Sequence, residues 1–114
     1  MIRRTFASAL LAAFGLAAVP AFAQQNVTKF VVPFPPGGGT DQYVRLLAAD
    51  LTKKGMQVVV ENKPGASGII AADYVARAKP DGQTILMSSL GVLASNTVMY
   101  DKLPYNPQKD FAPV

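Results

Sequence analysis

The sequence predicts an α/β fold built on a doubly wound parallel sheet, and three observations support this prediction. Short apolar segments alternate with amphipathic helical segments in the order β-α-β-α-β-α between residues 27 and 100. The connections between these segments are short, which favours parallel strands joined by right-handed crossovers. The first two strands each run into a glycine-rich loop, at the strand end where sheets of this kind bind ligands.

Residues 1–23 have the features of a secretory signal peptide. A basic start at Arg3 and Arg4 precedes the apolar residues 6–19, which are too few for a comfortable membrane span. An A-x-A pattern ends at Ala23 and is followed by polar residues. We therefore expect cleavage after Ala23 and a periplasmic mature protein that starts at Gln24. A retained N-terminal anchor is the alternative.

The composition excludes several classes of function. The chain has 114 residues and contains neither cysteine nor histidine. Disulfides, thiol catalysis, and metal sites built from thiolate or imidazole are therefore impossible, and we expect no metal and no cofactor. Without Arg3 and Arg4, nine basic residues stand against seven acidic ones. Since no basic cluster remains, we expect no nucleic acid partner.

The mature sequence begins with an apolar strand over residues 27–34. A helix follows from about Asp41, with an apolar face spaced at i, i+3, i+4 and i+7. Thr40 or Asp41 is predicted as its N-cap and Gly55 as the residue that ends it. The residues on the apolar face are Val44, Leu47, Ala48 and Leu51.

The same order then repeats. We predict a second strand over 57–62, a second helix over 68–79, a turn at 80–82, a third strand over 84–88, a short helix over 91–100 and a proline-rich connection over 105–114. The second helix turns Ile69, Ala72, Val75 and Ala76 inward. A sheet of three strands leaves an unfinished edge, so we expect residues 24–114 to be the N-terminal part of a longer chain.

Two loops carry the predicted site. The first contains Gly37-Gly38-Gly39 before Thr40 and Asp41, and the second contains Gly65-Ala66-Ser67-Gly68. Glycine allows positive φ and a close approach of the backbone to a ligand. Each loop leads into a helix, whose free N–H groups and positive dipole end suit an anion. Two such loops on neighbouring parallel strands would lie side by side.

Other interpretations of these loops fit less well. Gly37-x-Gly39 begins a dinucleotide-binding fingerprint, and Glu61 ends the next strand, but Gln42 stands where the third glycine belongs. A phosphate-binding P-loop needs a lysine that this loop lacks. A nucleophile elbow would need glycine at Ile69, and no histidine is present to activate a serine. The glycines as simple turn formers, and Asp41 as an ordinary N-cap, are the structural alternatives.

Four motifs in order carry a resemblance to a known family. They are Pro33-Phe34-Pro35-Pro36-Gly37-Gly38-Gly39-Thr40-Asp41, Val58-Val59-Val60-Glu61-Asn62-Lys63-Pro64-Gly65-Ala66, Lys79-Pro80-Asp81-Gly82, and Leu103-Pro104-Tyr105-Asn106-Pro107 followed by Lys109-Asp110-Phe111-Ala112-Pro113-Val114. Together they resemble the tripartite tricarboxylate transporter receptors, also called the Bug family. The resemblance implies ligand contacts from Pro35, Gly38, Gly39, Thr40 and Asp41 in the first loop and Ala66, Ser67 and Gly68 in the second. The family often has glycine where Ser67 stands.

The resemblance also implies an architecture and a function. Family members are similar to type II periplasmic binding proteins, with two α/β lobes joined by a hinge. They bind a small carboxylate solute in the cleft and deliver it to membrane transporter subunits. By this comparison, residues 24–114 form the first part of lobe one, and no catalytic residue is expected. Two alternatives remain: an exported α/β enzyme acting on an anionic molecule, and a sensing module that signals to a membrane kinase.

Overall fold

The computed structural model describes residues 26–114, so the predicted signal peptide lies outside the described residues. Three strands form a parallel sheet in the order β2-β1-β3. They are β1 (Val27–Val32), β2 (Gln57–Asn62) and β3 (Thr84–Leu86). The register pairs Val32 with Asn62 on one side of β1 and Val31 with Leu86 on the other. The predicted α/β fold with a parallel sheet is confirmed.

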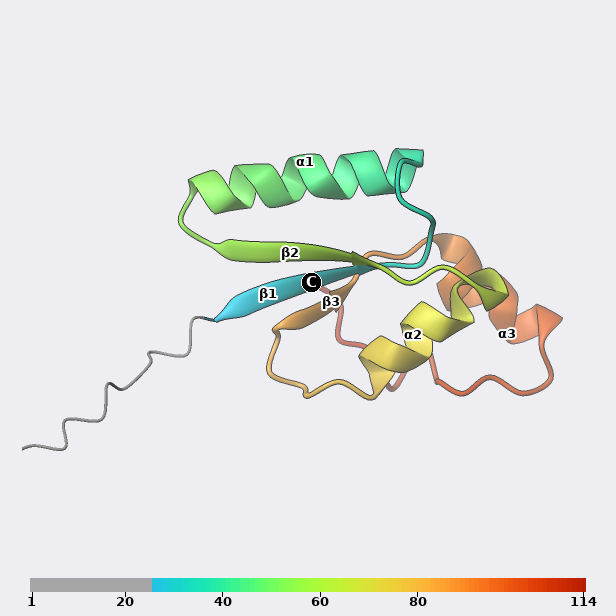
Figure 1. Ribbon diagram of the computed structural model, residues 1–114. Coiled ribbons are helices and arrows are strands. Elements are labelled where there is room, and N and C mark those ends of the chain that lie inside the picture. Colours follow the sequence, from blue (N-terminus) through green and yellow to red (C-terminus); the bar gives the residue numbers. More distant parts are fainter. Residues whose placement is uncertain (1–25) are drawn as a thin grey trace, which may run out of the picture.

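Helices cover both faces of this sheet (Figure 1). On one face lies α1 (Gly39–Lys53), with Val44 and Ala48 buried against Phe30 and Val32. The other face carries α2 (Ile69–Ala76), where Ala72 packs with Val92 and Tyr105. Alternate residues of a strand point to opposite faces, so the two apolar clusters have the sheet between them. This is the doubly wound arrangement that the sequence predicts.

The first and third strands are shorter than predicted. β1 ends at Val32 because the next residue, Pro33, has no N–H to donate to a neighbouring strand. β3 ends at Leu86, although the Met87 amide still donates to the Val31 carbonyl at 2.9 Å. The second strand has the predicted bounds.

The two later helices also differ from their predicted spans. The segment predicted as one helix over 91–100 is divided into a π-helical turn, η2 (Gly91–Ser95), and a short helix, α3 (Asn96–Met99). The predicted helix over 68–79 is shorter at both ends: α2 starts at Ile69, after a 3₁₀ turn, η1 (Ala66–Gly68), and ends at Ala76. Among residues 26–114, no helix is both long and apolar enough to cross a membrane.

Candidate functional site

Both glycine-rich loops leave the same edge of the sheet. The first follows β1 and the second follows β2, and these strands are parallel neighbours whose last residues, Val32 and Asn62, are paired. The Lys63 amide donates to the Val32 carbonyl at 2.8 Å, so the second loop starts against the end of β1. The predicted placement of the two loops at adjacent strand ends is therefore confirmed.

The first loop ends at an uncapped helix N-terminus. The first backbone bond into α1 is from the Gln42 amide to the Gly38 carbonyl, at 3.0 Å. The amides of Gly39, Thr40 and Asp41 precede that bond and have no acceptor within the helix. Gly38 occupies the N-cap position, and no side chain caps the helix. These donors lie at the positive end of the dipole of a fifteen-residue helix, a position that favours binding of an anion.

The prediction that Thr40 or Asp41 caps this helix is wrong. Both residues lie inside the first turn, and the Asp41 carboxylate turns back toward the loop. Its Oδ2 atom accepts the Gly37 amide at 2.9 Å and Arg45 Nε at 2.9 Å. Its Oδ1 atom accepts Asn62 Nδ2 at 2.8 Å. Asp41 is 2% exposed, and these donors occupy both carboxylate oxygens, so the carboxylate is turned away from a ligand.

These contacts hold Asp41 in its charged form. The hydrogen bond from Arg45, followed by those from the Gly37 amide and Asn62, lowers the pKa of Asp41 from 3.8 to about 2. The nearby Arg45 guanidinium also compensates the negative charge in the first turn of α1. A second anion at the end of that helix therefore meets less repulsion than an isolated carboxylate would produce.

Asn62 joins the end of β2 to the first loop and to α1. Besides Asp41, its side-chain amide donates to the Phe34 carbonyl at 3.1 Å, and its Oδ1 atom accepts Arg45 Nη2 at 3.0 Å. One side chain at the end of β2 thus fixes the start of the first loop and the first turns of α1. The geometry of the first loop depends on the neighbouring strand.

The second loop is a left-handed turn. Four consecutive residues have positive φ: Gly65 at 125°, Ala66 at 47°, Ser67 at 55° and Gly68 at 83°. Glycine adopts this conformation freely, but a residue with a Cβ atom pays roughly 1–2 kcal/mol for it. Ala66 and Ser67 are the described non-glycine residues with positive φ. Strain of this kind persists only where surrounding contacts enforce it.

Several contacts enforce the turn. The Gly68 amide donates to the Gly65 carbonyl at 3.0 Å. Asn96 Nδ2 donates to the Ser67 carbonyl at 3.0 Å, and the hydroxyl groups of Ser67 and Tyr100 share a hydrogen bond of 3.1 Å. Gly68 is buried so tightly that a Cβ atom there would lie 2.5 Å from Val92 Cγ2. The turn then leads into α2, whose N-terminus also lacks a side-chain cap.

The predicted contact residues differ in exposure. Those exposed at the loop surface are Pro35, Gly38, Gly39, Ala66 and Ser67; Thr40 is half-buried, and Asp41 and Gly68 are buried. The structure thus presents backbone amides and two hydroxyl groups at this edge, with the acidic side chain turned away. A role in ligand contact remains a prediction for each of these residues.

Four residues that support the loops were not predicted. Arg45 carries a signal, since it lies four residues after Asp41 on the same helix face. Asn62 is polar and ends an apolar strand beside the loops. Asn96 and Tyr100 carry no recognisable signal, because their partner Ser67 lies about thirty residues away.

Glu61 does not act as a ribose-binding acid in this structure. Its carboxylate forms ion pairs with Lys63 at 2.8 Å and Lys29 at 2.9 Å. Those two lysines, Lys63 first, lower the pKa of Glu61. With this acid engaged and Gln42 in place of the third glycine, the dinucleotide interpretation has no support. Residues 26–114 also contain no cluster of three or more side chains suited to a metal ion.

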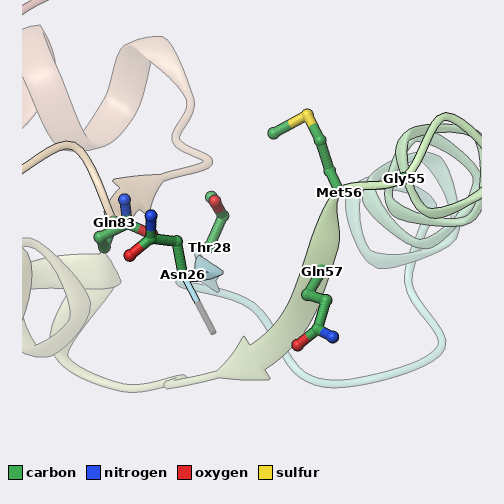
Figure 2. A pocket seen from close by; sticks show the side chains of 6 residues that line it. All are labelled: Asn26, Thr28, Gly55, Met56, Gln57 and Gln83. Carbon is green, nitrogen blue, oxygen red and sulfur yellow. The ribbon is translucent and has the colours of Figure 1, made fainter. Parts of the chain in front are cut away.

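A separate hollow of about 500 Å³ lies at the opposite end of the strands. Figure 2 shows its lining residues, which are Asn26, Thr28, Gly55, Met56, Gln57 and Gln83. No charged side chain lines it, and it is far along the strands from both glycine-rich loops. It therefore offers nothing specific to an anion, and the loop edge remains the candidate site.

Comparison with known proteins gives the family. Residues 43–114 match the family model described as "Tripartite tricarboxylate transporter family receptor". The curated relatives are 37–43% identical, and the chain spans only 24–34% of their length.

Solved structures agree with that match. The periplasmic binding protein BugD is 42% identical, with a TM-score of 0.71 over 76% of this chain and 29% of its own. Two Rhodopseudomonas palustris proteins also match. MatC, with bound malate, is 43% identical, with a TM-score of 0.70 over 77% of this chain and 31% of its own. Rpa4515, with adipate, is 41% identical, with a TM-score of 0.67 over 71% of this chain and 27% of its own. The chain therefore belongs to the tripartite tricarboxylate transporter receptor family.

Proposed function

We propose that this chain is the first part of lobe one of a periplasmic receptor, which binds a small dicarboxylate without transforming it. The observation that carries the proposal is the pairing of an uncapped α1 N-terminus with the left-handed turn at one sheet edge. Malate and adipate, which are bound to similar proteins, are both dicarboxylates. One carboxylate of such a solute would accept hydrogen bonds from the amides of both loops.

Backbone donors are sufficient for this role. Each hydrogen bond to a charged group contributes roughly 1.5–3 kcal/mol, and the helix dipole adds roughly 0.3–1 kcal/mol. Micromolar binding requires about 8 kcal/mol. Three or four such contacts approach that value only where water is excluded. The loops are exposed in residues 26–114, so the proposal includes a second lobe that closes over them.

The proposal extends to location and partners. Relatives of this chain are periplasmic binding proteins, and residues 1–23 carry the signal peptide pattern that directs export. The family description points to the membrane subunits of a tripartite transporter as the partner. No observation on the described residues favours the enzyme or the sensor kinase alternative.

Isothermal titration calorimetry tests the proposal. Residues 24–114 are compared with the same residues extended by the coding sequence that follows in frame, each titrated with malate and adipate. We expect micromolar affinity for at least one dicarboxylate in the extended protein, and weak or undetectable binding by residues 24–114. Micromolar affinity in residues 24–114 alone would refute the need for a second lobe. No binding in either protein, or conversion of the dicarboxylate into a product, would refute the receptor itself.

A further inference from the structure

The left-handed turn of the second loop depends on a residue from a different part of the chain. Ala66 and Ser67 hold positive φ although both carry a Cβ atom. The bonds within the turn run from the Gly68 amide to the Gly65 carbonyl and from the Ile69 amide to the Ala66 carbonyl. Neither bond engages the carbonyl or the hydroxyl of Ser67, and both of these groups contact residues outside the turn.

Asn96 provides the buried contact of this kind. It is 3% exposed and is the first residue of α3. Its Nδ2 atom donates to the Ser67 carbonyl at 3.0 Å and to the Tyr105 hydroxyl at 3.4 Å. The carbonyl of Ser67 belongs to the same peptide unit as the Gly68 amide. Fixing that carbonyl therefore also fixes the Gly68 amide, which closes the turn through its bond to the Gly65 carbonyl.

The position of Asn96 is itself fixed. The Tyr105 hydroxyl donates to the Val92 carbonyl at 2.6 Å, and Val92 and Tyr105 are buried in the cluster that packs on α2. The Tyr105 ring meets Phe111 edge to face at a centroid distance of 5.8 Å. Buried contacts among η2, α3 and the proline-rich segment that follows them thus hold Asn96 in place.

We propose that Asn96 is a positioning residue, which holds Ser67 in the left-handed conformation that aims the second-loop amides at an anion. The link to an anion depends on the proposed receptor function, whereas the effect on the Ser67 conformation does not. The same proposal gives the segment after β3 a role in the site, although its own polar groups need not touch the ligand.

The test uses NMR on the full chain, comparing wild type with N96A and with N96L, which fills a similar volume without a donor. A strong intraresidue amide-to-Hα NOE marks positive φ. We expect this signal at Ser67 in wild type and its loss in both variants. Adding S67G should restore the wild-type shifts of Gly68 and Ile69, because glycine adopts positive φ without strain. The exposed neighbour Thr97 gives the control T97A, which should keep the wild-type signal.

A titration of the extended protein with malate and adipate, followed at the amides of Gly39 and Gly68, forms the second arm. We expect N96L to bind about tenfold more weakly than wild type and N96L/S67G to recover, a change of about 1.4 kcal/mol. Retention of the positive-φ signal in N96A and N96L would overturn the proposal. Loss of folding in every Asn96 variant, with or without S67G, would also overturn it, by assigning Asn96 to stability alone. If wild type binds neither dicarboxylate, the receptor function fails, and the NOE arm still decides the role of Asn96.

Discussion

The side-chain amide of Asn62 donates to Oδ1 of Asp41 across 2.8 Å, although the two residues are 21 positions apart in the sequence. This bond joins the end of β2 to the first turn of α1. The buried Asp41 carboxylate therefore stabilises the first loop through internal hydrogen bonds, and backbone amides are exposed on the surface of that loop.

The Asn62 side chain is expected to contribute measurably to stability. N62A leaves the Phe34 carbonyl and Asp41 Oδ1 without their donor, which should lower the free energy of unfolding by roughly 1–3 kcal/mol. Urea unfolding followed by circular dichroism measures the change. The control is Q108A, at an exposed residue of the proline-rich segment. Equal stabilities of N62A and Q108A would contradict the role assigned to Asn62.

Stability should fall in acid because of Asp41. Its pKa is about 2 in the folded protein and 3.8 ordinarily, so the unfolded chain binds more protons between these values. The stabilisation is present above about pH 4 and is lost as the pH falls toward 2. We expect D41N to show a flatter dependence of unfolding free energy on pH over this window. A D41N curve parallel to that of wild type would contradict the assignment. E61Q is a useful comparison, since the pKa of Glu61 is also lowered.

Gly68 and Gly82 form a matched pair for testing close packing. Both have positive φ, 83° and 76°, but a Cβ atom at Gly68 would meet Val92 and Pro33, whereas one at Gly82 meets nothing within 4 Å. G68A should therefore destabilise the protein by about 1–3 kcal/mol more than G82A, the usual effect of overpacking. Thermal unfolding measures the difference. Substituting V92A in the G68A background should recover part of the loss, and equal effects of G68A and G82A would argue against the tight contact.

The amide of Gly39 can be removed without ending α1. Gly39 is the first helical residue, where proline is favoured, and Gly38 already has a ψ of 168° that suits a following proline. G39A keeps the N–H and places its Cβ in open space. In the extended protein, G39P should bind malate or adipate about tenfold or more weakly than G39A, because one hydrogen bond to a charged group is lost. Calorimetry showing equal affinities would exclude this amide from the site.

Export should remove the first 23 residues. Expression in a Gram-negative host followed by mass spectrometry of the periplasmic fraction is expected to show a mature N-terminus at Gln24. A23D, which breaks the A-x-A pattern, should retain the precursor. A mature protein that still begins at Met1 would favour the membrane-anchored alternative.

The sequence was sufficient for the architecture because the architecture follows from periodicity. The spacing of Val44 and Ala48 identifies the buried face of α1, and the alternation of strands and helices predicts a parallel sheet. From that sheet follows the position of both loops at one edge. Each of these inferences depends on residues close together in the chain.

The details of the site depend on contacts that local patterns do not encode. Asp41 looks like an N-cap in the sequence, but a buried carboxylate takes the donors that surround it, and these include Asn62 from another strand. The residue types of Ala66 and Ser67 do not indicate positive φ, because neither residue prefers it. The partner that holds Ser67 in this conformation, Asn96, comes from a helix 29 residues further on.

The strand order β2-β1-β3 sets a sequence of assembly. β1 pairs along six residues with β2, which is thirty positions later, and along three with β3, which is more than fifty positions later. The nearer and longer pairing is the easier one to nucleate. We therefore expect the first loop to form before the second loop gains its contact with Asn96, because Asn96 follows β3 in the chain. Pulsed hydrogen exchange during refolding should therefore show protection of the amides in the first loop before those in the turn around Ser67.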